Sequence, residues 1–236
     1  MRNMKTWMRA AVALGFAAVA ASASADIVVR TGVDAGGSVM APGSMDTRWR
    51  ISVDDKQTYT DTKVLYPLVN PNDVYSGGQI CCGMQTVANT AAWISDPSVS
   101  ASSPNTQWGV GEDVWIETSF DLTGYDLATV AFSGLWRVAD HSLGIYLNGN
   151  LIPGTAINST WGSDHAVSVA LGSSSFLQGV NTLEIRASSL NSGWDGLWMD
   201  ATVTGRQPGG TVPVPATLAL AVLGLGLVAA QRRRAG

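Results

Sequence analysis

The chain has 236 residues, and its 14 basic and 18 acidic residues give a formal net charge of −4 at pH 7. All 18 acidic residues but only eight of the basic ones lie in residues 26–210, so this part carries a net charge near −10. Such a surface repels phosphate backbones and anionic lipid head groups, which argues against a nucleic-acid partner. The size of this part fits one sizeable domain.

The first 25 residues have the three parts of a secretory signal peptide. Basic residues precede an apolar run over residues 10–21, and Ala23 and Ala25 form an A-x-A-like cleavage site. Signal peptidase accepts only small side chains at these two places, so we predict cleavage after Ala25 and an exported chain that begins at Asp26. An N-terminal membrane anchor is the alternative, but the apolar run is short for one.

The body, residues 26–205, shows short segments of alternating polarity separated by turn residues, and almost no helical periodicity. In residues 114–120, for example, Val114 and Ile116 alternate with Trp115 and Glu117, which places the first pair on a buried face and the second on a wet one. This spacing predicts an all-β fold, an antiparallel β-sandwich or barrel. The predicted strands are 49–53, 114–120, 129–138, 144–147, 167–171, 183–187 and 197–203.

Two local patterns refine this prediction. Asn148-Gly149 follows a predicted strand and tolerates positive φ at both positions, so it indicates a tight hairpin turn. In residues 197–203, Leu197 and Met199 alternate with Trp198. We therefore expect Trp198 on the wet face of the last strand.

The body resembles the galactose-binding-like jelly rolls, and the resemblance extends over residues 46–205. It rests on the segments 46–51, 92–94, 118–125, 134–140, 145–149, 176–183 and 195–199. The resemblance implies a jelly-roll β-sandwich in which Trp49, Trp93 and Trp136 belong to the core. Residues 26–45 and 54–90 match no family pattern.

Cys81 and Cys82 are the only cysteines, and they are adjacent in a glycine-rich segment. In an oxidising compartment two thiols usually pair, so a vicinal disulfide is one prediction; free thiols or a bond between molecules are the alternatives. A structural role is favoured over a redox one. No further cysteine or histidine cluster completes a zinc site, so no metal or cofactor is predicted.

Catalytic motifs are not found in the sequence. His141 and His165 are the only histidines, and Asp140 is adjacent to His141, so the two would point to opposite faces of a strand. No nucleophile elbow, HExxH motif or phosphate loop is present. We therefore predict that the protein is not an enzyme. A secreted polysaccharide hydrolase is the alternative, which would need two facing carboxylates in a deep pocket.

Tryptophans in loops are the candidate binding residues. Trp161 and Trp194, the latter followed by Asp195, lie among small and polar residues, and Trp108 is a weaker third candidate. An indole face stacks on the C–H face of a sugar while neighbouring polar groups bind its hydroxyls, which predicts carbohydrate binding. Burial under a loop is the alternative for each. Oxygen ligands near Trp194 would suit a structural Ca²⁺, but no ligand spacing in the sequence identifies such a site.

The C-terminal segment has the features of a membrane anchor. After a predicted linker, residues 206–211, Pro213-Val214-Pro215 precedes an apolar span, residues 216–230, and then Arg232-Arg233-Arg234. As a helix the apolar span would be roughly 22 Å long, somewhat short for a hydrocarbon core of about 30 Å. The arginines favour the cytoplasmic side, which leaves the body outside.

This order of a proline-flanked tripeptide, Ala-Thr, a Gly/Leu-rich span and arginines resembles the PEP-CTERM sorting signal of bacteria that make exopolysaccharide. The resemblance covers residues 212–236 and implies processing by an exosortase near the tripeptide. The family's glutamate is Val214 here, which keeps open a permanently tail-anchored protein that is not processed.

Together these patterns predict an exported, non-catalytic protein of the cell envelope or exopolysaccharide matrix. Signal peptidase, an exosortase, the inner membrane and an exopolysaccharide are its expected partners. Before processing, the helix over residues 216–230 would hold the protein in the membrane; afterwards it would be at the cell surface or in the matrix.

We expect the mature protein to begin at Asp26 and to lack Arg232-Arg233-Arg234, because both terminal signals would be removed. Intact-mass spectrometry of the native protein measures both ends and counts the thiols of Cys81 and Cys82. Cell-associated protein that retains the three arginines would indicate permanent anchoring. Full-length protein in the cytosol would contradict export.

Overall fold

The computed structural model describes residues 22–65, 90–98, 108, 111–158, 162–189 and 195–211, with side chains between residues 26 and 207. Residues 24–208 form one compact unit. Within the described part, no helix has the length and apolar character needed to cross a membrane. The helix predicted over residues 216–230 lies outside it.

All described regular structure is β-strand, as the alternation in the sequence predicts. The strands are β1 (Ser22–Arg30), β2 (Met45–Ser52), β3 (Thr60–Val64), β4 (Ile94–Ser95), β5 (Asp113–Asp121), β6 (Asp126–Ala139), β7 (His141–Leu147), β8 (Asn150–Leu151), β9 (His165–Val169), β10 (Val180–Ser188) and β11 (Gly196–Thr211). β1 includes Ala23 and Ala25 of the predicted peptidase site, and β11 continues through the predicted linker.

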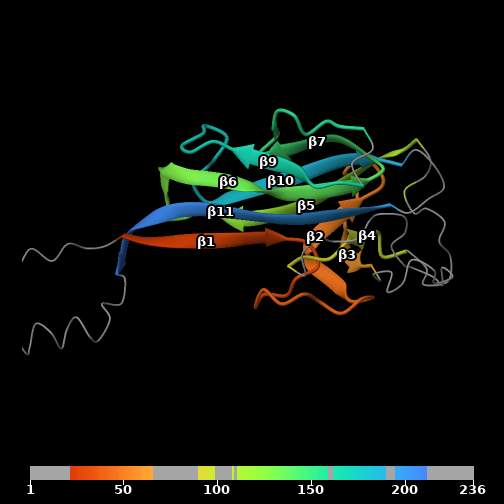
Figure 1. The fold of residues 1–236 in the computed structure, drawn as a ribbon, viewed down its shortest axis with the longest axis horizontal. Coiled ribbons are helices and arrows are strands. Elements are labelled where there is room, and N and C mark those ends of the chain that lie inside the picture. The colour runs from red at the N-terminus through yellow and green to blue at the C-terminus, as the bar shows by residue number, and fades with distance from the viewer. Residues whose placement is uncertain are drawn as a thin grey trace, which may run out of the picture. The chain divides into compact units, whose positions relative to one another are not determined.

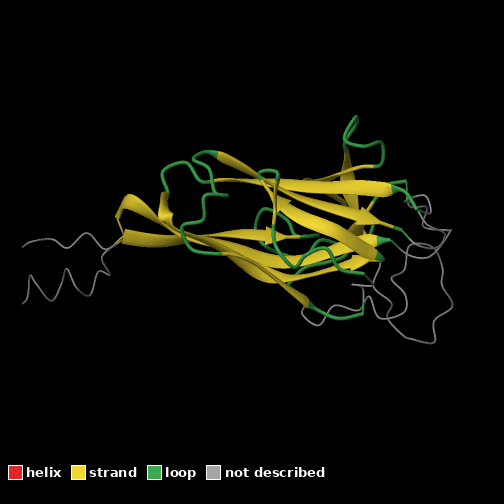
Figure 2. Cartoon of the chain, turned by 90° about the horizontal axis from the view of Figure 1, so that it is seen from above, coloured by secondary structure: helices red, strands yellow, loops and turns green. Residues whose placement is uncertain are grey.

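The strands are hydrogen-bonded in the order β8-β7-β10-β5-β2-β3-β4-β11-β6-β9, and β1 also pairs with β11 (Figure 1). The pairs β5–β10, β7–β10 and β6–β11 are antiparallel. The predicted all-β, antiparallel class is therefore confirmed. Viewed from above, the strands of this unit form two layers (Figure 2).

The core lies between the layers and follows the predicted alternation. Val114 and Ile116 of β5 and Leu183 and Ile185 of β10 are 0–1% exposed and belong to one apolar cluster with residues of β6 and β11. Ile116 stands directly opposite Ile185 in the β5–β10 register. Directly opposite residues lie on the same face of the sheet, so the apolar side chains of β5 and those of β10 are buried in the same core.

The tryptophans expected in the core are there. Trp49, Trp93 and Trp136 are 0–1% exposed. Trp198, expected on the wet face of β11, is also only 1% exposed, so that prediction is wrong. Its indole N–H donates to the carbonyl of Ala91 at 3.3 Å, because a chain segment distant in the sequence covers this side of β11.

Side chains of β2 satisfy carbonyl groups of β1. The Arg48 guanidinium donates to the Val28 carbonyl at 2.8 Å, and the Trp49 indole donates to the Arg30 carbonyl at 2.9 Å. These two contacts fall where the β2–β3 register shifts, between Asp46 and Arg50. Unpaired carbonyls at the edge of a sheet can pair with a strand of another molecule. By satisfying two carbonyls of β1, the irregular part of β2 reduces the tendency of β1 to form such pairs.

The predicted hairpin turn is confirmed. Asn148 and Gly149 connect β7 to β8 with φ values of 51° and 77°. The Asn148 side chain donates to the carbonyl of Ser175 and accepts from the backbone N–H of Thr182, at 2.8 and 2.9 Å. This turn residue therefore also ties the β7–β8 hairpin to β10 and the segment that precedes it.

Gly134→Ala should destabilise the fold, because a Cβ at residue 134 would lie 2.4 Å from the Cα of Ala201, its partner in the β6–β11 ladder. Backbone must shift to relieve this contact, at an expected cost of about 1–3 kcal/mol in the free energy of unfolding. Urea denaturation measures it.

Gly162→Ala is the matched control, since a Cβ there meets nothing within 4 Å. We expect it to change the free energy of unfolding by less than about 0.5 kcal/mol. Equal stability of the two variants would contradict the close β6–β11 approach.

Candidate functional site

The solvent side of β2, β5, β10 and β7 carries a group of polar and aromatic side chains that contact one another. On β5 the outward row runs Asp113, Trp115, Glu117 and Ser119, between the buried residues of the inward row. We call this side the outer face. The row spans seven residues, or roughly 20 Å at the usual strand rise.

Strand register brings partners from three other strands to this row. Glu184 of β10 stands opposite Glu117 on one side and opposite Tyr146 of β7 on the other. Arg186 stands opposite Trp115, and Arg50 of β2 stands opposite Glu117. The β5–β10 register therefore places two carboxylates side by side at the centre of the outer face.

Two like charges directly opposite each other destabilise a sheet, and here each has a cation. Glu117 forms an ion pair with Arg50, and Glu184 forms one with Lys56. Both glutamate side chains are only 15% exposed, so these pairs are partly shielded from solvent. Charge balance at the centre of the face thus depends on Lys56, which comes from the loop between β2 and β3.

Lys56 also sits on the Trp115 indole. Its ammonium lies 3.7 Å from the centroid of the Trp115 ring, a cation–π geometry. The Tyr146 ring lies 5.8 Å from Trp115 at an interplanar angle of 47°, and the Arg186 guanidinium carbon lies 5.4 Å from it. The indole N–H donates to Asp55 at 3.2 Å. Trp115 is therefore fixed in position by its neighbours while it remains partly exposed.

A short turn holds Lys56 in this position. Asp55 and Lys56 have φ values of 54° and 67°, which non-glycine residues adopt infrequently. The Asp54 carboxylate accepts from the Thr58 hydroxyl, the Thr58 backbone N–H and the Ser52 hydroxyl at 2.6, 2.9 and 2.8 Å. The Thr58 hydrogen bonds, followed by that of Ser52, lower the pKa of Asp54 to about 2.

Tyr59 extends the aromatic surface next to the turn. The Arg50 guanidinium carbon lies 5.0 Å from the centroid of its ring. Burial, and then the carboxylate of Glu117, raise the pKa of the Tyr59 hydroxyl well above its usual value. The phenol therefore stays neutral and keeps its proton under all physiological conditions.

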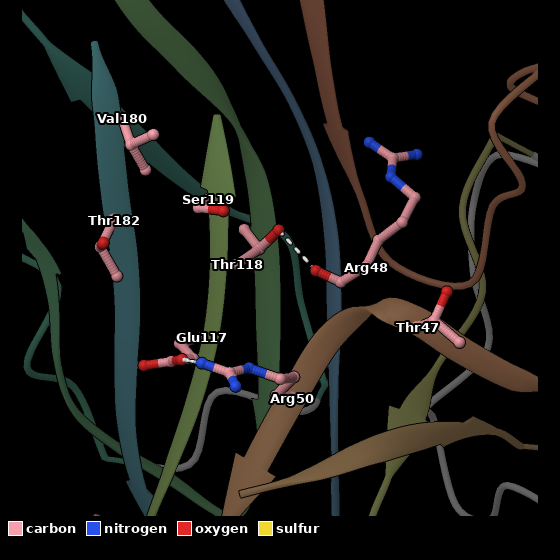
Figure 3. A pocket seen from close by; sticks show the side chains of 8 residues that line it. All are labelled: Thr47, Arg48, Arg50, Glu117, Thr118, Ser119, Val180 and Thr182. Atoms are coloured by element: carbon pink, nitrogen blue, oxygen red, sulfur yellow. Dashed lines mark hydrogen bonds and ion pairs between the residues drawn. The ribbon is translucent and has the colours of Figure 1, made fainter. Parts of the chain in front are cut away.

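A groove of about 340 Å³ lies at one end of the outer face, and we call it the arginine groove. The groove opens where β2 diverges from β5. The β2–β5 pairing covers Arg50 to Ser52 and does not extend to Arg48. At Arg48 the carbonyl accepts a hydrogen bond from the Thr118 hydroxyl, at 2.8 Å, in place of a backbone N–H. Figure 3 shows the Arg50 guanidinium pointing at Glu117 and that of Arg48 pointing away from Arg50. The lining residues are Thr47, Arg48, Arg50, Glu117, Thr118, Ser119, Val180 and Thr182.

A second groove, of about 510 Å³, lies at the other end, and we call it the acidic groove. Its lining residues are Val53, Asp54, Asp55, Gln57, Gly111, Glu112, Asp113 and Arg186. The lining thus contains four carboxylates and one guanidinium. The Nε of Arg186 donates to the Asp113 carboxylate at 3.0 Å. Trp115 lies between the two grooves, since Asp113 lines one and Glu117 the other.

Most residues predicted from the sequence as site residues lie outside the described part. They are Trp161, Trp194, Cys81, Cys82, Pro213, Val214, Pro215, Arg232, Arg233 and Arg234. Asp195, immediately before β11, is 2% exposed. Trp108, the weaker third candidate, is 0% exposed and belongs to the core, so the alternative of burial holds for it.

The histidines lie at strand starts. His141 begins β7, and His165 begins β9, which is the last strand in the sheet order. The His165 ring lies 5.4 Å from Trp136 and 3.4 Å from the Ser163 hydroxyl. Among the residues that the structure describes, no group of three or more His, Cys, Asp or Glu side chains could hold a metal ion.

The outer face was not among the predicted sites, although the sequence contains a signal for it. The alternation in residues 114–120 places Trp115 on the wet side of its strand. A search for binding tryptophans in loops passes over a tryptophan in a strand. The partners Lys56 and Glu184, 59 and 69 positions away in the sequence, have no pattern that links them to it.

No family model and no curated protein matches the chain. The native structure of a family 35 carbohydrate binding module from Clostridium thermocellum is similar at 10% identity with a TM-score of 0.32, covering 75% of this chain and 97% of that chain. An isomalto-dextranase of Arthrobacter globiformis T6, complexed with panose, is similar at 10% identity with a TM-score of 0.25, covering 78% of this chain and 32% of that one. Both TM-scores are too low to assign a function.

The turn that carries Lys56 should loosen only in strong acid. The pKa of Asp54 is lower in the folded state than in the unfolded state. The ionised carboxylate therefore stabilises the turn fully above about pH 3.8, and this stabilisation is lost as the pH falls through about 2. We expect the backbone amide resonance of Thr58, which donates to Asp54, to titrate with a midpoint near pH 2 in NMR spectra.

Asp121→Asn is the matched control, since Thr123 lowers the pKa of Asp121 in the same way at the end of β5. This variant should leave the Thr58 titration unchanged, whereas Asp54→Asn should remove it. A Thr58 midpoint near pH 4 would contradict the proposed anchoring.

Proposed function

We propose that this is an exported, non-catalytic protein of the bacterial cell envelope or exopolysaccharide matrix that binds polysaccharide through its outer face. The observation that carries the proposal is the partly exposed Trp115 with Tyr146 beside it, between two grooves on one side of a sheet. Aromatic faces stack on the C–H faces of sugar rings, and grooves on either side extend the contact along a chain.

The polar groups around Trp115 suit sugar hydroxyls. Arginine and carboxylate side chains line both grooves, and Ser119 and Thr182 add hydroxyl groups to the arginine groove. These donors and acceptors are held by ion pairs before any ligand arrives. Preorganised polar groups reduce the entropy lost on binding.

Binding is favoured over hydrolysis by the state of the two central carboxylates. A glycosidase needs one carboxyl group to donate a proton and a second to act as nucleophile or base. Glu117 and Glu184 are opposite each other, but each is engaged by a cation, Arg50 or Lys56. Neither is therefore positioned to give a proton to a leaving group.

The remaining parts of the proposal come from the sequence. The galactose-binding-like jelly roll rests on the segments between residues 46 and 205, and the antiparallel two-layered sheet is consistent with it. Export rests on the signal peptide, and surface sorting by an exosortase rests on residues 212–236. A protein that stays tail-anchored because of Val214 would display the same outer face.

Trp115→Ala should lower the affinity for polysaccharide about tenfold or more, because the stacking surface is removed. Pull-down on insoluble glycans and a glycan array that includes the cell's own exopolymer measure it. Leu171→Ala is the control, since Leu171 is 68% exposed and lines neither groove. Reducing-sugar release from the same polymers should stay at background.

Trp161→Ala and Trp194→Ala distinguish the outer face from the loop tryptophans. If both loop variants still bind polysaccharide and Trp115→Ala does not, the binding site is on the outer face. Loss only in the loop variants would move it to the loops and contradict the assignment to Trp115. Turnover by wild type that disappears in Glu117→Gln would favour the hydrolase.

A further inference from the structure

We infer that the outer face selects polysaccharides whose sugars carry free, protonated amino groups, such as glucosamine units, over neutral and N-acetylated ones. This inference rests on the proposed polysaccharide binding and names its ligand class. Lys56, the balance of charge around Trp115 and the overall charge of the body support it.

Lys56 shows where the face holds an ammonium group. Its Nζ lies over the Trp115 ring and pairs with Glu184, so one aromatic face and one carboxylate define a site for a primary ammonium. The Lys56 side chain is 37% exposed, so the site lies at the surface and a ligand can reach it. An indole face with an adjacent carboxylate is suited to such a cation.

The surroundings have excess negative charge. The acidic groove next to Trp115 has four carboxylates and one guanidinium among its lining residues. Asp55 belongs to this groove and also accepts the indole N–H of Trp115. The body as a whole carries a net charge near −10, which attracts a cationic polymer before contact.

An amino sugar can replace Lys56 without loss of charge balance. When its ammonium takes the position over Trp115, Glu184 keeps a cation and the displaced Lys56 enters water. A neutral sugar that stacks on Trp115 must also displace Lys56, but it leaves Glu184, 15% exposed, without its cation. Leaving a shielded charge unpaired is costly, so this difference produces selectivity.

The arginine groove determines in which direction a bound polysaccharide lies across the outer face. Arg48 and Arg50 repel a second ammonium at that end, whereas the carboxylates of the acidic groove attract one. We therefore expect the amino-bearing units to lie over Trp115 and the acidic groove. Hydroxyl-bearing or acetylated units are accepted at the arginine groove.

Isothermal titration calorimetry of the purified mature protein with three oligosaccharides of equal length tests this inference. The probes are fully deacetylated chito-oligosaccharide, its N-acetylated form, and cello-oligosaccharide. At pH 6 we expect at least tenfold tighter binding of the free amine. The preference should decline as the pH is raised and the sugar amines lose their protons.

Three variants and two matched controls locate the ammonium site. Trp115→Ala and Glu184→Gln should each reduce the preference for the free amine about tenfold, while Asp126→Asn, which removes the same charge from β6, should leave it unchanged. Lys56→Met should tighten binding of the free amine severalfold, because nothing then has to be displaced. Lys63→Met, on β3, is its control. Circular dichroism and the melting temperature check that each variant is folded.

The outcomes separate this inference from the proposed function. Equal affinity for free and acetylated oligomers, or a preference that does not change with pH, overturns the amine selectivity and leaves polysaccharide binding in place. Weaker binding by Lys56→Met also overturns it, since Lys56 would then contact the ligand. Binding of no polysaccharide, neutral or charged, overturns the proposed function. The pH dependence of binding by the wild-type protein tests the amine selectivity even where a variant fails to fold.

Discussion

The pairing register of β5 with β10 is the constraint on which the rest of the structure depends. Ile116 stands opposite Ile185 and enters the core, and the next pair along, Glu117 with Glu184, therefore faces solvent. A slip of either strand by one residue would turn its glutamate into the core and its isoleucine to water. Hydrophobic burial thus fixes a polar arrangement that would be unfavourable by itself, with two carboxylates next to each other.

The structure resolves this repulsion with cations from outside the two strands. Arg50 comes from β2, which is itself in register with β5, whereas Lys56 comes from a turn with two non-glycine residues at positive φ. The hydrogen bonds to Asp54 stabilise that turn and compensate for its unfavourable backbone. Strain in the loop, charge balance on the sheet and the position of Trp115 are therefore coupled.

Local pattern predicted much of the fold and part of the site. Alternation identified β5, β10 and β11 and placed Trp115 on the wet side of its strand, because burial of one sheet face produces a period of two in the sequence. It failed at Trp198, since the segment near Ala91 that covers this residue is distant in the chain and no local pattern records it. The contact of Lys56 with Trp115 was not predictable for the same reason: it depends on how a loop turns in space.

The range of the electrostatic forces indicates what the outer face can discriminate. At physiological ionic strength screening acts over about 8 Å, so the overall negative charge of the body speeds encounter but distinguishes poorly between cationic ligands. Discrimination must come from contacts that salt screens weakly. Glu184 is such a contact, because it is 15% exposed and its cation lies against an aromatic ring. A site built from one shielded carboxylate and one indole recognises an ammonium group by its size and hydrogen-bonding geometry as well as by its charge, which a diffuse acidic surface cannot do.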